Sequence, residues 1–74
     1  MNTRIRAMRE DHDFTQVQVA EALGITQRKY SYLETGMQQW TDELLVRLAV
    51  FYQTSVDYLL ELTDEVAPYP PKRL

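Results

Sequence analysis

Four side chains with hydrogen-bonding groups gather on one side of the segment from residue 27 to residue 35. They are Gln27, Arg28, Ser31 and Tyr32. At about 100° of rotation per residue they share one helix face, while Tyr30 and Leu33 point the opposite way. A guanidinium on such a face can pair with both acceptors of a guanine, and an amide can pair with an adenine. The alternative is a solvated polar face with no ligand.

Three further residues could contact the sugar–phosphate backbone of a duplex. Gln16 and Thr26 stand at the starts of two successive helices, where free amides and the positive end of the helix dipole attract phosphate oxygens. Lys29 would add a positive charge beside them. Tyr32 could also reach a phosphate, or pack on a thymine methyl group. For Thr26, helix capping is the plainer role, and the two roles can coexist.

Two short amphipathic helices that meet at a glycine must position these side chains. Val19 and Leu23 fall at helical spacing before the junction, as Tyr30 and Leu33 do after it. Gly24 stands where the first of these helices must end, because glycine takes the left-handed conformation without steric penalty. The pattern predicts a helix, a sharp turn and a second helix whose polar face looks outward.

From Gln16 to Gly36 the chain resembles the helix-turn-helix of the phage-repressor and Cro family of bacterial regulators. The matching residues are Gln16, Ala20, Gly24, Ile25, Tyr30, Leu33, Glu34, Thr35 and Gly36. The resemblance extends from Arg4 to about Asp64. It implies a domain that dimerises and lays its third helix in the major groove, with Gln27, Arg28 and Tyr32 at the usual base-contact positions.

The fold expected from sequence and resemblance is all-α: a compact, five-helix, lambda-repressor-like domain with the helix-turn-helix at helices two and three. The helices are expected over residues 2–11, 16–23, 27–35, 42–53 and 56–62, with Asn2 or Thr3 capping the first. The buried side of the fourth helix is predicted to carry Leu45, Leu48, Ala49 and Tyr52. The DNA-binding domain would span residues 1–66, and a proline-rich tail would occupy residues 67–74.

Two positions depart from the pattern of the resembled family. The loop from Met37 to Trp40 offers two glutamines and two apolar residues, where the family often carries Lys or Arg against the DNA backbone. Glu61 stands where the family usually places a glycine that ends the last helix. The fifth helix is therefore expected to continue towards Asp64.

Arg9 and Glu34 match positions that pair in several members of the family, between helix one and the end of the reading helix. If they pair here, the pair would fix the angle of the reading helix. The alternative is two independent surface charges, which contribute little to stability.

Four apolar residues suggest a surface for self-association. Val46 and Val50 are expected on the outer side of the fourth helix, and Tyr58 and Leu62 on the outer side of the fifth. Such a patch suits a two-fold contact between identical subunits. A homodimer is expected because one module with about four reading side chains specifies too short a DNA sequence. The dimer would span two half-sites about 34 Å apart, which is one turn of the double helix.

Composition argues against several other classes of function. With 74 residues, a single histidine and no cysteine, the chain offers no catalytic triad, metal cluster or disulfide, so we expect no enzyme, metal, cofactor or small-molecule ligand. The histidine, His12, is expected to be a solvated loop residue. No apolar run reaches the length of a membrane span, and a cytoplasmic protein is expected.

Net charge leaves two functions open. The chain has a formal net charge of −3 at pH 7. Residues 1–36 contain five basic and five acidic residues, so the excess of acidic residues lies in the second half. The first hypothesis is sequence-specific binding of double-stranded DNA by a homodimeric regulator, expected to be a repressor acting on an inverted repeat. The second is a protein-interaction module of the same fold, such as an antirepressor or antitoxin component, with weak DNA binding.

Overall fold

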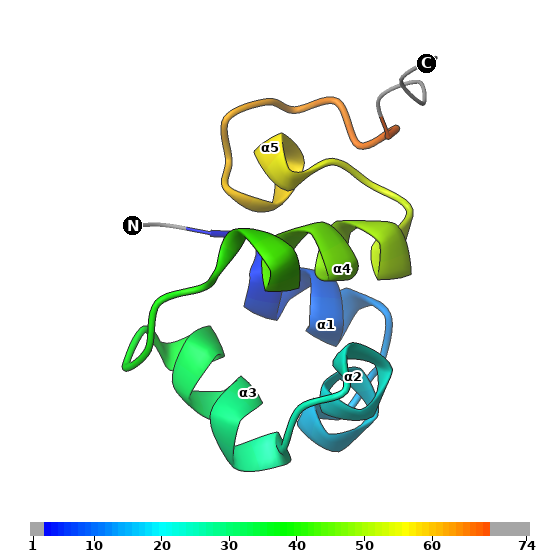
Figure 1. The fold of residues 1–74 in the computed structure, drawn as a ribbon. Helices are drawn as coiled ribbons and strands as arrows, with labels where there is room; N and C mark the ends of the chain where they lie inside the picture. The colour runs from blue at the N-terminus through cyan, green and yellow to red at the C-terminus, as the bar shows by residue number, and fades with distance from the viewer. Residues whose placement is uncertain (1–2, 69–74) are drawn as a thin grey trace, which may run out of the picture.

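A computed structural model describes residues 3–68, which contain five α-helices and no strand (Figure 1). The helices are α1 (Ile5–Asp11), α2 (Gln16–Leu23), α3 (Gln27–Thr35), α4 (Asp42–Tyr52) and α5 (Val56–Leu59). In Figure 1, α2 and α3 lie together at one end of the molecule and α5 lies at the other, with α1 and α4 between them. The all-α prediction and the placement of the helix-turn-helix in α2 and α3 are confirmed.

Each helix contributes apolar side chains to one core. Its members are Ile5, Met8, Val19, Ala20, Leu23, Tyr30, Leu48, Ala49, Tyr52 and Leu59. On α4 the prediction was incomplete, because Leu44 is 6% exposed while Leu45 is only partly buried against the core. Successive leucines on a helix diverge by about 100°, so the position of the neighbouring helices decides which one is covered.

Hydroxyl side chains cap four of the five helices. At α2 the cap is a reciprocal capping box: Thr15 Oγ1 accepts from the amide of Gln18 at 3.1 Å, and Gln18 Oε1 accepts from the amide of Thr15 at 2.8 Å. The exception is α1, which begins at Ile5 without a side-chain cap. The predicted cap at Thr3 was therefore wrong, and Asn2 lies outside the described residues.

The backbone of Arg4 explains the later start of α1. Its φ and ψ of −93° and 7° are not helical, and its amide donates to the carbonyl of Leu59 at 2.8 Å, so the chain before α1 turns towards α5. At the other end of α1, His12 is exposed as predicted, but it is not simply solvated. Its Nδ1 lies 2.8 Å from the carbonyl oxygen of Met8, and its ring stacks on Phe14 at 5.9 Å.

The predicted extension of the fifth helix was wrong, since α5 ends at Leu59. Glu61 itself adopts the left-handed conformation, with φ at 61°. The amide of Leu62 then donates to the carbonyl of Asp57 at 2.8 Å, which satisfies a carbonyl at the helix end. A glycine is thus unnecessary at this turn, although a side chain pays a steric penalty there.

The side chain of Arg4 closes the same end of α5. Its Nη1 donates to the carbonyls of Tyr58 and Thr63 at 2.9 and 2.6 Å, and its Nη2 pairs with Asp64 at 2.8 Å. The guanidinium also lies 4.3 Å from the centre of the Tyr58 ring. A positive charge at the carbonyl end of a helix interacts favourably with the negative end of the helix dipole. The chain after Leu59 is therefore folded back to the start of α1 instead of continuing as helix.

Replacing Glu61 with glycine should raise the free energy of unfolding by about 0.5–1 kcal/mol, because glycine removes the left-handed strain at the end of α5. Gly24, with φ at 73°, provides the reverse comparison: Gly24→Ala should destabilise although its new methyl group would meet no atom within 4 Å. Urea denaturation of both variants measures these effects. A loss of stability in Glu61→Gly would contradict the assignment of strain to this residue.

Candidate nucleic-acid interface

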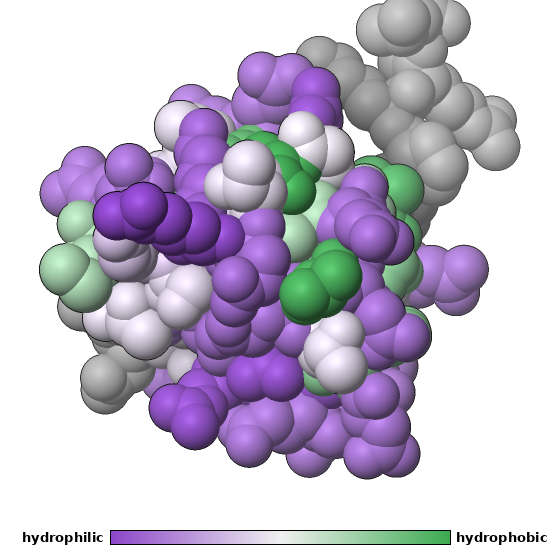
Figure 2. Space-filling model, turned by 90° about the horizontal axis from the view of Figure 1, so that it is seen from below, coloured by the Kyte–Doolittle hydropathy of each residue, from purple (hydrophilic) through white to green (hydrophobic). Residues whose placement is uncertain are grey.

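The outer face of α3 carries the predicted reading residues. Gln27 and Arg28 are exposed and Tyr32 is half-buried, whereas Tyr30 on the opposite side is completely buried. Figure 2 shows the molecule from the end at which α2 and α3 lie, and hydrophilic residues dominate that face. Among the described residues no other element covers α3 there (Figure 1). A ligand can therefore reach these side chains directly.

The inner face of α3 is held rigidly. Tyr30 packs edge-on against Trp40, with ring centres 6.1 Å apart. Leu33 is 3% exposed. The helix begins at Thr26, whose Oγ1 accepts from the amide of Lys29 at 3.1 Å, and it ends at Gly36 in the left-handed conformation. Because packing and caps fix both ends, the orientation of α3 follows from the rest of the domain.

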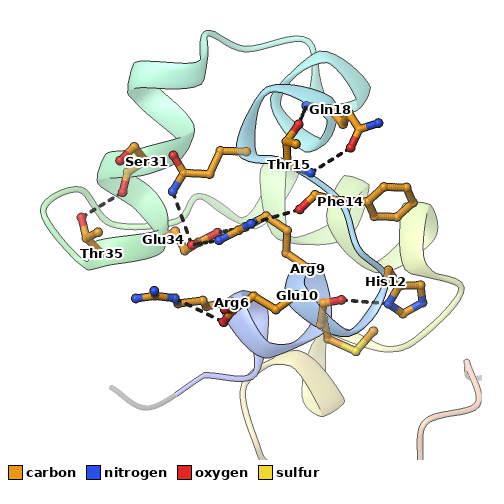
Figure 3. A network of polar contacts seen from close by, with 12 residues as sticks. Arg6, Arg9, Glu10, His12, Phe14, Thr15, Gln18, Ser31, Glu34 and Thr35 are labelled. Atoms are coloured by element: carbon orange, nitrogen blue, oxygen red, sulfur yellow. Dashed lines mark hydrogen bonds and ion pairs between the residues drawn. The ribbon is translucent and has the colours of Figure 1, made fainter.

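A charge pair joins α3 to α1. Arg9 Nε and Nη2 donate to the two carboxylate oxygens of Glu34 at 2.8 and 2.9 Å (Figure 3). The side chains are 14% and 3% exposed, so the alternative of two independent surface charges is excluded. Burial works to raise the pKa of Glu34, but the hydrogen bonds that the carboxylate accepts, that from Arg9 foremost, together with the positive charge of Arg9 outweigh burial and hold that pKa below its ordinary value. Arg9 also donates to the carbonyl of Phe14 at 3.0 Å.

Hydrogen bonds of two side-chain amides connect the charge pair to the exposed face of α3. Gln16 Nε2 lies 3.4 Å from Glu34 Oε1, and Gln16 Oε1 accepts from Gln27 Nε2 at 2.8 Å. The structure thus brings together the predicted phosphate-contact residue of α2 and the first predicted reader of α3. This bond was not predicted, although both glutamines stand at the first position of their helices.

Arg28 and Tyr32 also meet. Arg28 Nε donates to the hydroxyl of Tyr32 at 3.0 Å, and its guanidinium carbon lies 5.5 Å from the ring centre. Their i, i+4 spacing is the signal by which this contact could have been found in the sequence. Ser31, the remaining predicted reader, is half-buried and its carbonyl accepts from Thr35 Oγ1 at 2.8 Å (Figure 3).

Comparison with known proteins assigns the chain to a protein family. A family model described as Helix-turn-helix matches residues 5–59, which is well over half of the chain. The chain belongs to this family. The match includes the whole of α2 and α3, and it confirms the resemblance to the phage-repressor and Cro type of transcriptional regulator. Such a family is one of regulators and not a class of enzymes.

One relative supports the same assignment. The chain is 40% identical over 65 residues to an uncharacterized HTH-type transcriptional regulator, YobD, of Bacillus subtilis (strain 168). The aligned part covers 88% of this chain but 58% of the relative, so the chain spans less than two thirds of that protein's length. No solved structure matches the chain.

The residues predicted for self-association lie in different surroundings. Val46, Val50 and Leu62 are 54%, 72% and 71% exposed. Tyr58 is half-buried beneath the guanidinium of Arg4, and Leu62 follows the turn at the end of α5 instead of lying on the helix. The two valines line a shallow groove. Its other apolar walls are Ala49, Val56 and Pro68.

Other site classes find no support in the part of the chain that the structure describes. Within residues 3–68 no cluster of His, Cys, Asp or Glu could hold a metal ion. In the same range no helix has both the length and the apolar composition needed to cross a membrane. The described loop between α3 and α4 has no basic side chain, which agrees with the departure noted in the sequence.

Raising the pH above about 10 should destabilise the domain, because two buried phenols would have to ionise. Burial raises the pKa of Tyr52 to about 12, and burial together with the Glu34 carboxylate raises the pKa of Tyr30. The phenols of the unfolded chain ionise at a pH of about 10, so their contribution is complete below that pH. The part due to Tyr52 is lost as the pH rises to about 12, and the part due to Tyr30 is lost at higher pH. Urea midpoints from neutral pH upward measure the loss. Tyr52→Phe should lose stability less steeply, and an identical slope would contradict the assignment.

Proposed function

We propose that this chain binds double-stranded DNA sequence-specifically, as the DNA-binding domain of a cytoplasmic transcriptional repressor. In this proposal α3 enters the major groove and presents Gln27 and Arg28 to base edges, with Ser31 and Tyr32 beside them. Gln16, Thr26 and Lys29 contact the phosphates at the groove edges. Repression follows from occupying DNA that RNA polymerase needs.

One observation carries this proposal: the polar face of α3 is uncovered while its opposite face is fixed by the core and by the Arg9–Glu34 pair. A base-reading helix must keep its side chains at a fixed angle to the groove, and such bracing supplies that angle. Membership of the helix-turn-helix family and the name of the relative YobD support the same function.

We further propose a homodimer on an inverted repeat. Its contact surface would include Val46 and Val50, with Tyr58 and Leu62 as further candidates. Val50 is the most exposed of the four, so an aspartate there would charge the surface without entering the core. Val50→Asp should shift the protein towards monomer in sedimentation and weaken binding to a full operator more than to a single half-site. Unchanged sedimentation would place the contact elsewhere.

Selection of bound sequences from a random DNA pool is the direct test. We expect enrichment of an inverted repeat with half-sites about one helical turn apart. Titration of the selected DNA and of random DNA across a salt series should then show weak non-specific binding, because the chain carries −3 overall and has no basic loop after α3. Failure to enrich any sequence would overturn the proposal.

A protein-interaction module is the second candidate function. The acidic balance of the chain favours it, as does the exposed valine groove between α4 and the segment that follows it. On this alternative, the fold is retained while specific DNA binding is lost. The same selection separates the two functions, since a module without DNA specificity enriches no sequence.

A further inference from the structure

The contact between Arg28 and Tyr32 has a geometry that bears on base recognition. Arg28 Nε donates to the hydroxyl of Tyr32 at 3.0 Å, and the guanidinium carbon lies 5.5 Å from the ring centre. Both residues lie on α3, four positions apart, so the distance between their backbone atoms is fixed by the helix. Tyr32 is half-buried, whereas Arg28 is exposed. The phenol is therefore the better ordered partner, and it holds the more mobile one.

The atoms used in this contact determine which atoms remain for a ligand. A guanidinium can offer a base either its Nε and one Nη, or its two Nη groups. The Tyr32 hydroxyl occupies Nε, which leaves Nη1 and Nη2 for bonding. Those two groups form a planar fork that matches the O6 and N7 acceptors on the major-groove edge of guanine.

We propose that Tyr32 is a positioning residue that presents Arg28 to a guanine through its two Nη groups. This inference rests on the proposed function, because it assumes that α3 reads DNA. It differs from a direct contact between Tyr32 and a base or a phosphate. Tyr32 contributes by ordering the flexible side chain of Arg28 before DNA binds. Less conformational entropy is then lost when the complex forms.

Neighbouring polar groups do not offer Arg28 an alternative partner of the same kind. Gln27 is bonded to Gln16, and Glu34 accepts both of its strong hydrogen bonds from Arg9. Among the described residues, Tyr32 is thus the side chain that the structure gives Arg28 as a hydrogen-bond acceptor. The conservative substitution Tyr32→Phe keeps the ring and removes that acceptor.

A double-mutant cycle on selected DNA tests the inference. The parent, Tyr32→Phe, Arg28→Ala and the double variant are titrated against the selected operator and against three operators that replace one guanine by each other base. The guanine is the position at which Arg28→Ala loses discrimination. Tyr32→Phe should reduce the parent's preference for that guanine about fivefold, the effect of one ordinary hydrogen bond. Added to Arg28→Ala, it should change nothing at this position. Thermal unfolding of each variant verifies the fold.

The other outcomes are distinguishable. If Tyr32→Phe weakens binding to all four operators equally, with or without Arg28, the hydroxyl contacts a phosphate and the inference is overturned. If Tyr32→Phe keeps the full preference for guanine, Arg28 orders itself and the inference is again overturned, while the proposed function stands. If the parent enriches no sequence from the random pool, both the proposed function and this inference fail.

Discussion

Glu34→Ala should lower the free energy of unfolding by about 3–5 kcal/mol, the largest effect expected from any single polar substitution in this domain. The carboxylate is 3% exposed and accepts two hydrogen bonds from Arg9, which is itself 14% exposed. Removing it leaves a guanidinium largely buried without a counter-charge. Small domains have a total stability of only about 5–15 kcal/mol, so the variant would be close to unfolding. Urea denaturation measures the loss.

A matched control lies on the same helix as Arg9. Arg6 and Glu10 form an i, i+4 pair at 3.3 Å, but their side chains are 70% and 56% exposed. Glu10→Ala should therefore change the stability by less than about 0.5 kcal/mol. Equal effects of Glu10→Ala and Glu34→Ala would contradict the view that burial of the second pair is what matters.

The same pair predicts an acid dependence of stability. The pKa of Glu34 is lowered in the folded protein, so its contribution is complete above the unfolded value of about 4.3 and is lost as the pH falls through the folded value. Stability should thus decrease in acid. In Glu34→Gln this part of the decrease should be absent, because an amide does not ionise in that range.

Arg28→Ala should cost about 1–3 kcal/mol of binding free energy on the selected operator, and should relax specificity at one base position. The guanidinium is exposed on the outer face of α3 and held by Tyr32, so the truncation leaves the core intact. Fluorescence anisotropy with the operator and its single-base variants measures both effects. Operator binding as tight as that of the parent would mean that Arg28 is not a base reader.

Lys29 provides the comparison for Arg28 on the adjacent position of α3. It is exposed, and a phosphate contact is proposed for it. Lys29→Ala should therefore weaken binding to all sequences about equally and reduce the slope of affinity against salt by about one. A base-specific loss in Lys29→Ala would exchange the roles proposed for these two residues.

The residues that cap and end the helices could be predicted from the sequence without knowledge of the tertiary structure. Thr15, Thr26, Thr41 and Ser55 each cap the helix that follows, and Gly24 and Gly36 end the helices that precede them. These signals act within a few residues, so the chain needs no distant partner to express them. Residues 27, 28 and 32 could likewise be assigned to one face of α3, because helical periodicity alone decides it.

The two helix ends that were predicted wrongly, the start of α1 and the end of α5, are held by contacts with a segment distant in the sequence. The start of α1 depends on a bond from Arg4 to Leu59, and the end of α5 depends on the left-handed Glu61 and on carbonyls that Arg4 holds. Helix signals near Thr3 and beyond Leu59 could not reveal these contacts, because the partners are more than fifty residues apart along the chain. Tertiary packing overrides local propensity at such ends.

The order of the residues is enough to specify short capped helices and a polar face on the helix after Gly24, since those properties follow from neighbours in the chain. Tertiary structure alone decided that Glu34 is buried against Arg9 and is linked through Gln16 to Gln27. Charge pairing depends on burial, and burial depends on how α1, α2 and α3 pack together. The residue types made the contact possible, and the packing of the three helices brought the side chains within hydrogen-bond distance.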